Sequence, residues 1–271
     1  DITPVGGVHG TPFSPYNESW SVEFDGTGDY LGVADDASFS FGSGDFTIET
    51  WFYASEAASG SDYHIVSHGT DSINFWAIRL RNAGDRGLEF RWYASSEVIS
   101  INQGADFTAI NEWHHVAVTR NGNSWRMFLD GTQVGSTVTN SGTIADFTTF
   151  EIGALLGQYG TFNGYISNLR VVKGTAVYTS NFTPSTTPLT DVSGTSLLTC
   201  NANRFIDTSS NAHTITVNGN SAIRGFSPFA DTDTVTGSGY FDASTDKLTF
   251  TDTSNNLDLG GAQASFECWY Y

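Results

Sequence analysis

Apolar and polar residues alternate over many short stretches of this chain, which is the pattern of strands that bury one face. Across residues 46–53, every second side chain falls on one face, namely Phe46, Ile48, Thr50 and Phe52. The same alternation predicts strands over 113–120, 125–130 and 165–172. No helical period continues beyond about two turns, so strands are the expected elements throughout.

Turn residues separate these stretches at intervals of roughly ten residues. Asn121-Gly122 stands between two expected strands and is a strong hairpin signal, and Asp130-Gly131 turns the chain again. Many short strands joined by tight turns are typical of sandwiches and jelly rolls. The sequence therefore predicts an all-β fold, an antiparallel β-sandwich of the jelly-roll type.

The opening of the chain returns near its end, which indicates an internal repeat. Residues 24–31 (FDGTGDYL) recur as 241–248 (FDASTDKL), and 13–16 (FSPY) recur as 226–229 (FSPF). The offset grows from 213 at Phe13 to 217 at Phe24 and 218 at Trp51, as small loop insertions between equivalent strands would produce. We therefore expect a tandem repeat of sandwiches.

The repeat suggests where one copy ends and the next begins. Residues 184–195 are rich in Pro, Thr and Ser, lack strand alternation, and are interpreted as a linker. We expect a first sandwich over residues 1–183 that lacks its first strand, and the truncated start of a second sandwich over 196–271. On this interpretation the chain is a piece of a longer protein.

Charge excludes several classes of partner. The chain has 29 acidic and 11 basic residues, a formal net charge of −18 at pH 7. Nucleic acid and anionic membranes repel such a chain, and no apolar run reaches the length of a membrane span. We expect no nucleic-acid partner and no membrane insertion. The two cysteines, Cys200 and Cys268, stand in no metal-binding spacing and are expected to be structural thiols.

Five motifs, in order, resemble the laminin-G-like, concanavalin A-like lectin/glucanase jelly-roll superfamily. They lie at 24–30, 46–51, 113–119 (WHHVAVT), 128–131 (FLDG) and 162–166 (FNGYI). The resemblance covers about residues 24–172 and implies a lectin-like sandwich. It says much less about function, because this superfamily holds lectins, adhesion modules, glycosidases and spacers.

A narrower resemblance concerns 170–178 (RVVKGTAVY), 182–184 (FTP) and 196–200 (SLLTC). These stretches look like tandem modules in large structural proteins of marine bacteriophages, cyanophages especially. That implies a viral structural protein on a fibre or virion surface, therefore extracellular. Its implied partners are other virion or array proteins, further copies of itself and a host-surface glycan, although such domains also serve as spacers. Two alternatives stay open: a bacterial cell-surface adhesin, and a carbohydrate-binding accessory domain of a secreted glycoside hydrolase.

The sequence gives no support for catalysis. Glycosidases of this fold carry a Glu-x-Asp-x-x-Glu pattern, which sets two carboxyl groups about 5 Å apart. The chain has neither this pattern nor a Gly-x-Ser-x-Gly nucleophile elbow. His114 and His115 are adjacent on a strand and point to opposite faces, so they do not converge on one metal. We expect a non-enzymatic module in which His115 is hydrogen-bonded near the core.

Two pairs of acids are candidates for a calcium site. Asp25 and Asp29 flank a Gly-Thr-Gly turn, and they recur as Asp242 and Asp246. Ca²⁺ takes six to eight hard oxygen ligands, and such a turn can aim two carboxylates at one point. In the alternative, the same carboxylates only hold the turn through hydrogen bonds to the backbone.

Aromatic and polar residues that suit a sugar gather mainly between residues 63 and 93. The candidate stacking residues for a carbohydrate are Tyr63, Trp76, Trp92, Tyr93 and Tyr159. The candidate hydrogen-bond donors are His68, Asn74, Arg79 and Arg91. A sandwich also needs large aromatic residues in its core, so core packing competes with sugar binding for the tryptophans on strands. Tyr63 and Tyr159, expected in loops, are the better platform candidates.

Overall fold

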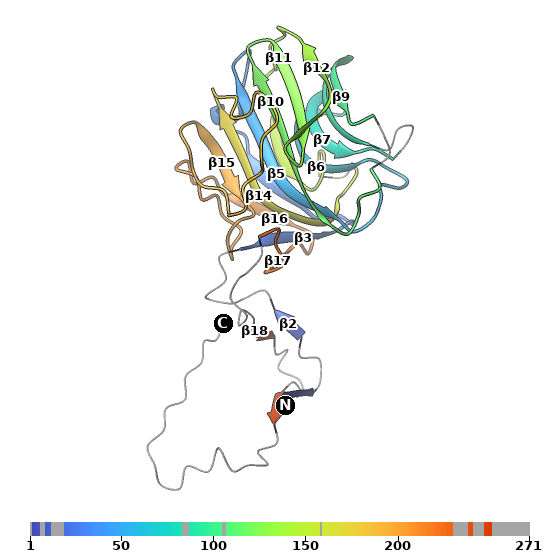
Figure 1. Cartoon of the computed structure of the whole chain (residues 1–271), viewed down its shortest axis with the longest axis vertical. Coiled ribbons are helices and arrows are strands. Elements are labelled where there is room, and N and C mark those ends of the chain that lie inside the picture. Colours follow the sequence, from blue (N-terminus) through green and yellow to red (C-terminus); the bar gives the residue numbers. More distant parts are fainter. Residues whose placement is uncertain are drawn as a thin grey trace. The chain divides into compact units, whose positions relative to one another are not determined.

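A computed structural model describes residues 2–5, 9–11, 19–82, 87–104, 107–157, 159–229, 238–240 and 247–250. The chain divides into two units. Glu18–Ala230 forms one, and Asp1–Asn17 together with Asp231–Tyr271 forms the other. The larger unit is a β-sandwich of two antiparallel sheets, which Figure 1 shows as two layers of strands.

The first sheet has eight strands, arranged in the order β12-β11-β10-β5-β14-β3-β17, with β15 also paired to β14. β3 and β15 pair with successive parts of the long strand β14, so they share one of its edges. The strands are β3 (Ser21–Asp25), β5 (Phe46–Ala54), β10 (Trp113–Asn121), β11 (Ser124–Leu129), β12 (Thr132–Thr139), β14 (Asn163–Lys173), β15 (Thr195–Thr199) and β17 (Ala222–Arg224).

The second sheet has seven strands in the order β16-β4-β13-β6-β7-β8-β9. They are β4 (Tyr30–Ala34), β6 (Tyr63–Asp71), β7 (Asn74–Leu80), β8 (Leu88–Ala94), β9 (Glu97–Asn102), β13 (Thr149–Ile152) and β16 (Ile215–Asn218). The only helical turn among the described residues is the short 3-10 helix η1 (Ala37–Phe39). The expected all-β antiparallel sandwich is therefore confirmed.

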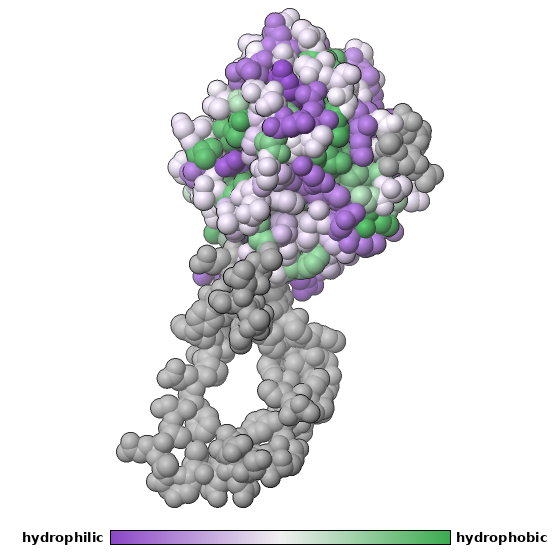
Figure 2. Space-filling model, in the orientation of Figure 1, coloured by the Kyte–Doolittle hydropathy of each residue, from purple (hydrophilic) through white to green (hydrophobic). Residues whose placement is uncertain are grey.

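One large hydrophobic cluster fills the space between the sheets. The face of β5 that carries Phe46, Ile48 and Phe52 points into it, as the alternation predicts. Trp76 from the second sheet and Trp125 from the first are both fully buried there. Outside this core, polar residues cover much of the visible face in Figure 2, and apolar residues form separate small patches.

The expected hairpins are present. β10 and β11 are joined by Gly122 and Asn123, with Gly122 at φ +59°, which suits the turns that join antiparallel strands tightly. Asp130 and Gly131 join β11 to β12, and both have positive φ, at +49° and +77°. A side chain at Gly131 would also overlap the Phe182 carbonyl, so glycine is needed there for space as well as for φ.

The expected domain boundary at residues 184–195 is wrong. β15 begins at the last residue of that stretch, and β16 and β17 follow it, yet the three strands pair with β14, β4 and β3 of the same sandwich. The stretch itself packs on the first sheet: Leu189 is buried, and the Thr190 carbonyl accepts a hydrogen bond from Arg170 Nη1 at 2.9 Å. Composition suggested a linker, but these contacts with β14 make the stretch part of one sandwich that continues to about residue 229.

The second unit is described through four short strands. β1 (Ile2–Val5) pairs with β19 (Lys247–Phe250), and β2 (His9–Thr11) pairs with β18 (Ser238–Tyr240), both antiparallel. The repeated stretch at 264–271, with Cys268, lies outside the described residues. Cys200 is buried in the sandwich as a free thiol, and burial raises its pKa to about 12. No helix of the described residues has the length and apolar character needed to cross a membrane.

Candidate functional site

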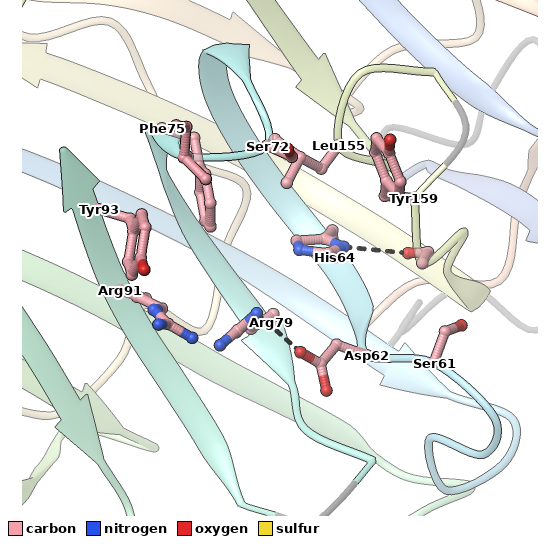
Figure 3. Close-up of a pocket in the computed structure, with 12 residues that line it drawn as sticks. Ser61, Asp62, His64, Ser72, Phe75, Arg79, Arg91, Tyr93, Leu155 and Tyr159 are labelled. Carbon is pink, nitrogen blue, oxygen red and sulfur yellow. Dashed lines mark hydrogen bonds and ion pairs between the residues drawn. The ribbon is translucent and has the colours of Figure 1, made fainter. Parts of the chain in front are cut away.

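A pocket of about 390 Å³ opens on the outer face of the second sheet, over β6, β7 and β8. Side chains alternate between the two faces of these strands, so the residues next in sequence to those in the core form the floor of the pocket. On β7, Trp76 and Ile78 point into the core, while Phe75 and Arg79 line the pocket. Figure 3 shows the pocket with the side chains that surround it.

The loop between β13 and β14 forms one wall of the pocket. Leu155 and Tyr159 form two backbone hydrogen bonds with each other, of 3.0 and 3.1 Å, which close the loop. Gly160 has φ +56°, and a Cβ there would overlap the Asp62 carbonyl, so only glycine permits this close approach. The Gly160 carbonyl accepts a hydrogen bond of 2.8 Å from the backbone N–H of His64. The loop thereby holds Tyr159 at the rim, where the residue is 46% exposed.

A buried ion-pair network fixes the polar floor. Arg79 donates through Nε to Glu89 at 2.8 Å, and its Nη1 lies 2.7 Å from Asp62. Glu89 also accepts a hydrogen bond of 2.7 Å from the hydroxyl of Ser100. Charged groups paired in this way are held in one position, because each satisfies the hydrogen-bonding capacity and the charge of the other. Arg79 is therefore a rigid feature of the pocket.

His64 is the unusual group of this site. Its side chain is buried, its Nδ1 lies 3.4 Å from the Gly160 carbonyl, and its Nε2 has no hydrogen-bond partner. Burial away from water, followed by the positive charge of Arg79, lowers its pKa to about 4. The imidazole is therefore neutral at pH 7. With the proton on Nδ1, facing the Gly160 carbonyl, Nε2 is an acceptor without a donor.

Aromatic rings and a second arginine complete the opposite side. Phe75 and Tyr93 stack with ring centroids 6.0 Å apart, and the Arg91 guanidinium lies 4.6 Å from the centroid of Tyr93. Arg91 is also 3.4 Å from Glu97. The pocket thus combines apolar ring surfaces with fixed donors and acceptors.

The structure brings together only part of the expected carbohydrate platform. Tyr93 and Tyr159 line the pocket, as do the expected donors Arg79 and Arg91. Trp76 and Trp92 are 0% and 3% exposed in the core, so the expectation that they stack on a sugar is wrong. Tyr63 also packs into the core, with its hydroxyl donating to Glu56 at 2.9 Å, and is not a platform residue.

Of the remaining expected donors, His68 is buried and Asn74 lies outside the pocket. The ring of His68 packs against Phe39, Trp76, Phe147 and Phe150. Asn74 instead donates to the carboxylate of Asp71 at 3.0 Å. Sequence reasoning missed Asp62 and His64, whose importance depends on the loop that ends at Gly160.

Asp25 and Asp29 hold a turn in the way that the alternative interpretation describes. Asp29 accepts hydrogen bonds from the backbone N–H of Asp25 at 3.0 Å and of Asn220 at 2.7 Å. Asp25 accepts from the N–H of Thr27 at 2.7 Å. No cluster of three His, Cys, Asp or Glu suited to a metal occurs in the described parts of the chain. Asp242 and Asp246 lie outside them, and a calcium site remains a prediction.

The two adjacent histidines have separate structural partners. His114 Nδ1 lies 2.8 Å from Asp130, and His115 Nε2 lies 3.2 Å from Glu49, which confirms the expected hydrogen bond of His115 near the core. Glu49 is fully buried and also accepts hydrogen bonds from Arg170 Nε at 2.9 Å and from the Tyr178 hydroxyl at 2.8 Å. Burial acts to raise the pKa of Glu49, but His115 and Arg170 outweigh it and hold the pKa below its ordinary value.

Comparison with known proteins supports the fold. A model of the concanavalin A-like lectin/glucanase superfamily matches residues 25–177, whereas no curated protein gave a match. A structure from Bacteroides ovatus, described as a candidate carbohydrate-binding protein, has a TM-score of 0.53 at 14% identity, covering 78% of this chain and 61% of its own. A heptameric SAP-like pentraxin from Limulus polyphemus has a TM-score of 0.50 at 15% identity, and the match covers 75% of this chain and 96% of the pentraxin chain.

At these identities the two solved structures show a shared fold, and the family match is what assigns the chain. That match extends from the end of β3 to the segment just beyond β14, so it includes most strands of both sheets. It spans more than half of the sequence. The chain therefore belongs to the concanavalin A-like lectin/glucanase superfamily, as a lectin-like jelly-roll domain.

Proposed function

We propose that this chain is a non-catalytic adhesive module that binds a glycan in the pocket over β6, β7 and β8. The observation that carries the proposal is Tyr159, 46% exposed at the rim of a pocket that also holds the fixed ion pair of Arg79 and Asp62. A sugar presents apolar C–H faces and hydroxyl groups. Hydroxyl groups suit fixed polar side chains, and an aromatic ring suits the C–H face.

The charged groups of the pocket fit the same ligand class. Arg79 and Asp62 are held in one geometry by their ion pair at 2.7 Å, so they offer a fixed donor and acceptor to a pair of hydroxyls. The superfamily includes lectins, and the Bacteroides ovatus neighbour is described as carbohydrate-binding. The acids Glu49 and Glu89 are each held by an arginine, which suits a structural role better than a catalytic one.

We place this module on a fibre or virion surface of a bacteriophage, outside the cell, as one of several repeated copies. Support comes from the resemblance of 170–178 and 196–200 to marine phage structural proteins, and from the repeat of 13–31 at 226–248. A pocket with one well-exposed aromatic residue at its rim is suited to weak binding at one site. Display of many copies raises the overall affinity without any new contact.

Binding should be tested on a glycan array with the full chain, followed by calorimetry on the glycans that bind. We expect Tyr159→Ala to weaken binding by about fivefold or more, because a stacking ring contributes about 1 kcal/mol. Val177→Ala is the matched control, since Val177 is exposed but lies outside the pocket. Both variants should melt as the wild type does. No binding by the wild type across the array would refute the proposal, as would equal losses in the two variants.

A further inference from the structure

Two edge strands close the sandwich, and both come from one short segment near its C-terminal end. We call residues 215–224, which contain β16 and β17, the clasp, and residues 21–34, which contain β3 and β4, the arch. β16 pairs with β4 at the edge of the second sheet, and β17 pairs with β3 at the edge of the first. One clasp therefore completes both layers of the sandwich by pairing with one arch.

The turn of the clasp is locked onto the turn of the arch. Asp29, which is 1% exposed, accepts the 2.7 Å hydrogen bond from the backbone N–H of Asn220, and the Asn220 side chain donates to Asp25 at 3.2 Å. Gly219 has φ +74°, and a Cβ there would overlap the Asp29 carboxylate. The lock therefore requires glycine in the clasp and aspartate in the arch.

Both partners of this pair occur a second time in the sequence. Residues 2–11 correspond to the clasp at an offset of 213, and residues 238–251 correspond to the arch at an offset of 217. Gly6 stands at the position of Gly219, and Asp246 at the position of Asp29. The chain thus carries two clasps and two arches, in the order clasp, arch, clasp, arch.

The second pair uses the same register as the first. In the sandwich, Ile215 opposes Val33 and Thr216 opposes Gly32. In the second unit, Ile2 opposes Phe250 and Thr3 opposes Thr249, which are the same partners after the two offsets. The agreement extends over all four pairs of β1 with β19 and all three of β2 with β18.

A short motif with two aromatic residues, which follows each clasp, is a third feature that the two copies share. Phe226 packs against Tyr53, Trp113 and Tyr165, with ring centroids 5.0 to 5.3 Å apart. The four residues 226–229 read FSPF, and the four that follow the first clasp, 13–16, read FSPY. The sequence that anchors Phe226 on the first sheet is therefore repeated after residues 2–11.

We propose that clasps are exchanged between repeats: a sandwich is closed by the clasp that follows it, and the clasp that precedes it closes the arch of another repeat of the same type. One arch has room for one clasp, and residues 215–224 already occupy the arch at 21–34. The clasp at 2–11 therefore pairs elsewhere, with the arch at 238–251, through β1 with β19 and β2 with β18. Added strands of this kind bind through the main-chain hydrogen bonds of an open sheet edge. The inference does not depend on glycan binding.

Disulfide trapping in the full chain tests which clasp closes which arch. A Cβ at Gly32 would lie 4.0 Å from the Cβ of Thr216, within the range that a disulfide spans. In a Cys268→Ser background, we expect Gly32→Cys/Thr216→Cys and Thr3→Cys/Thr249→Cys each to form the intended bond on mild oxidation. The matched control, Gly32→Cys/Thr3→Cys, is expected not to form it. Peptide mass spectrometry identifies the bonds, and melting of the reduced variants checks folding.

A disulfide in the control variant Gly32→Cys/Thr3→Cys would contradict the proposal. If Thr3 is trapped with Gly32 while Thr216 is not, the preceding clasp closes the sandwich and no exchange takes place. A second copy of this chain supplies an identical acceptor arch, so the exchange is also expected between chains. Chains with Thr3→Cys alone and with Thr249→Cys alone, refolded together at high concentration, should give a covalent dimer. A mixture of Thr3→Cys with Thr216→Cys, two clasps, should not. Equal dimer yields in both mixtures would overturn exchange between chains.

Discussion

Replacing His64 with glutamine removes a buried imidazole that folding keeps neutral. Burial away from water and then the charge of Arg79 lower its pKa from 6.5 to about 4. Glutamine keeps a donor for the Gly160 carbonyl but has no proton to gain in this pH range. The substitution therefore isolates the contribution of one titration to the stability of the pocket.

The sign of the effect follows from the two pKa values. Above pH 6.5, His64 is neutral in both the folded and the unfolded chain, and the pH has no effect through this group. As the pH falls from 6.5 toward 4, the unfolded histidine binds a proton and the folded one does not, so the free energy of unfolding decreases. At about 1.4 kcal/mol per pKa unit, the loss is about 2 kcal/mol at pH 5 and approaches about 3 kcal/mol below pH 4.

Urea unfolding of the wild type and His64→Gln at several pH values between 7.5 and 5 measures this loss. Carboxylates titrate in both proteins, so the difference between the two curves reports on His64. We expect the stability advantage of the wild type to shrink by about 2 kcal/mol over this range. Parallel curves would show that His64 is not held neutral, and would refute the reasoning about the pocket.

His114→Gln provides a control with the opposite sign. Burial acts to lower the pKa of His114, but the hydrogen bond and charge of Asp130 outweigh burial and raise it. A histidine with a raised pKa stabilises the folded chain below pH 6.5, and that contribution is lost as the pH rises through the folded pKa. On acidification, the wild type should therefore become more stable relative to His114→Gln. It should become less stable relative to His64→Gln.

Two further predictions concern the buried acids. Glu49→Gln should lower the free energy of unfolding by about 3 to 5 kcal/mol, because it leaves the buried guanidinium of Arg170 without its carboxylate. Urea unfolding at pH 7 measures the loss, and a change below about 1 kcal/mol would contradict a buried ion pair. Asp29→Ala should cost about 1 to 3 kcal/mol by removing the acceptor of the Asn220 N–H. That cost should be the same with and without EDTA, whereas a fall in the wild-type melting temperature on adding EDTA would favour calcium.

The alternation of the sequence predicts the strands correctly but leaves open which face of a strand is inside. On β8, Trp92 is in the core and Tyr93 lines the pocket. Both are aromatic, so pattern alone does not separate core from platform. The choice depends on which face meets the opposite sheet, where Trp92 stacks on Trp125 with centroids 5.6 Å apart. That contact joins residues too distant in the sequence for periodicity to reveal.

The sequence also misleads where composition and contacts disagree. Residues 184–195 have the composition of a linker, yet Leu189 donates its backbone N–H to Asn168 at 2.8 Å and is buried on the first sheet. The repeat also suggests that a new domain begins soon after this stretch. That interpretation takes the strands of each copy to pair only with one another. The strands at 195–224 instead complete the preceding sandwich. His64 was missed for a similar reason, since its partner Gly160 is 96 residues away.

The positions of the clasp and the pocket within the sandwich bear on what an array of such domains can do. The clasp strand β16 is at one edge of the second sheet, and β4 and β13 separate it from the pocket strands β6, β7 and β8. Exchange of clasps therefore uses none of the residues that line the pocket. In an array of the proposed kind, each sandwich would be closed by one clasp and would keep its own pocket. If each pocket binds weakly, the number of joined repeats sets the overall affinity. Gly219→Val, which forces a side chain against Asp29, should then lower the melting temperature of the sandwich while the affinity of its pocket stays unchanged, and a loss of affinity as large as that of Tyr159→Ala would contradict this separation.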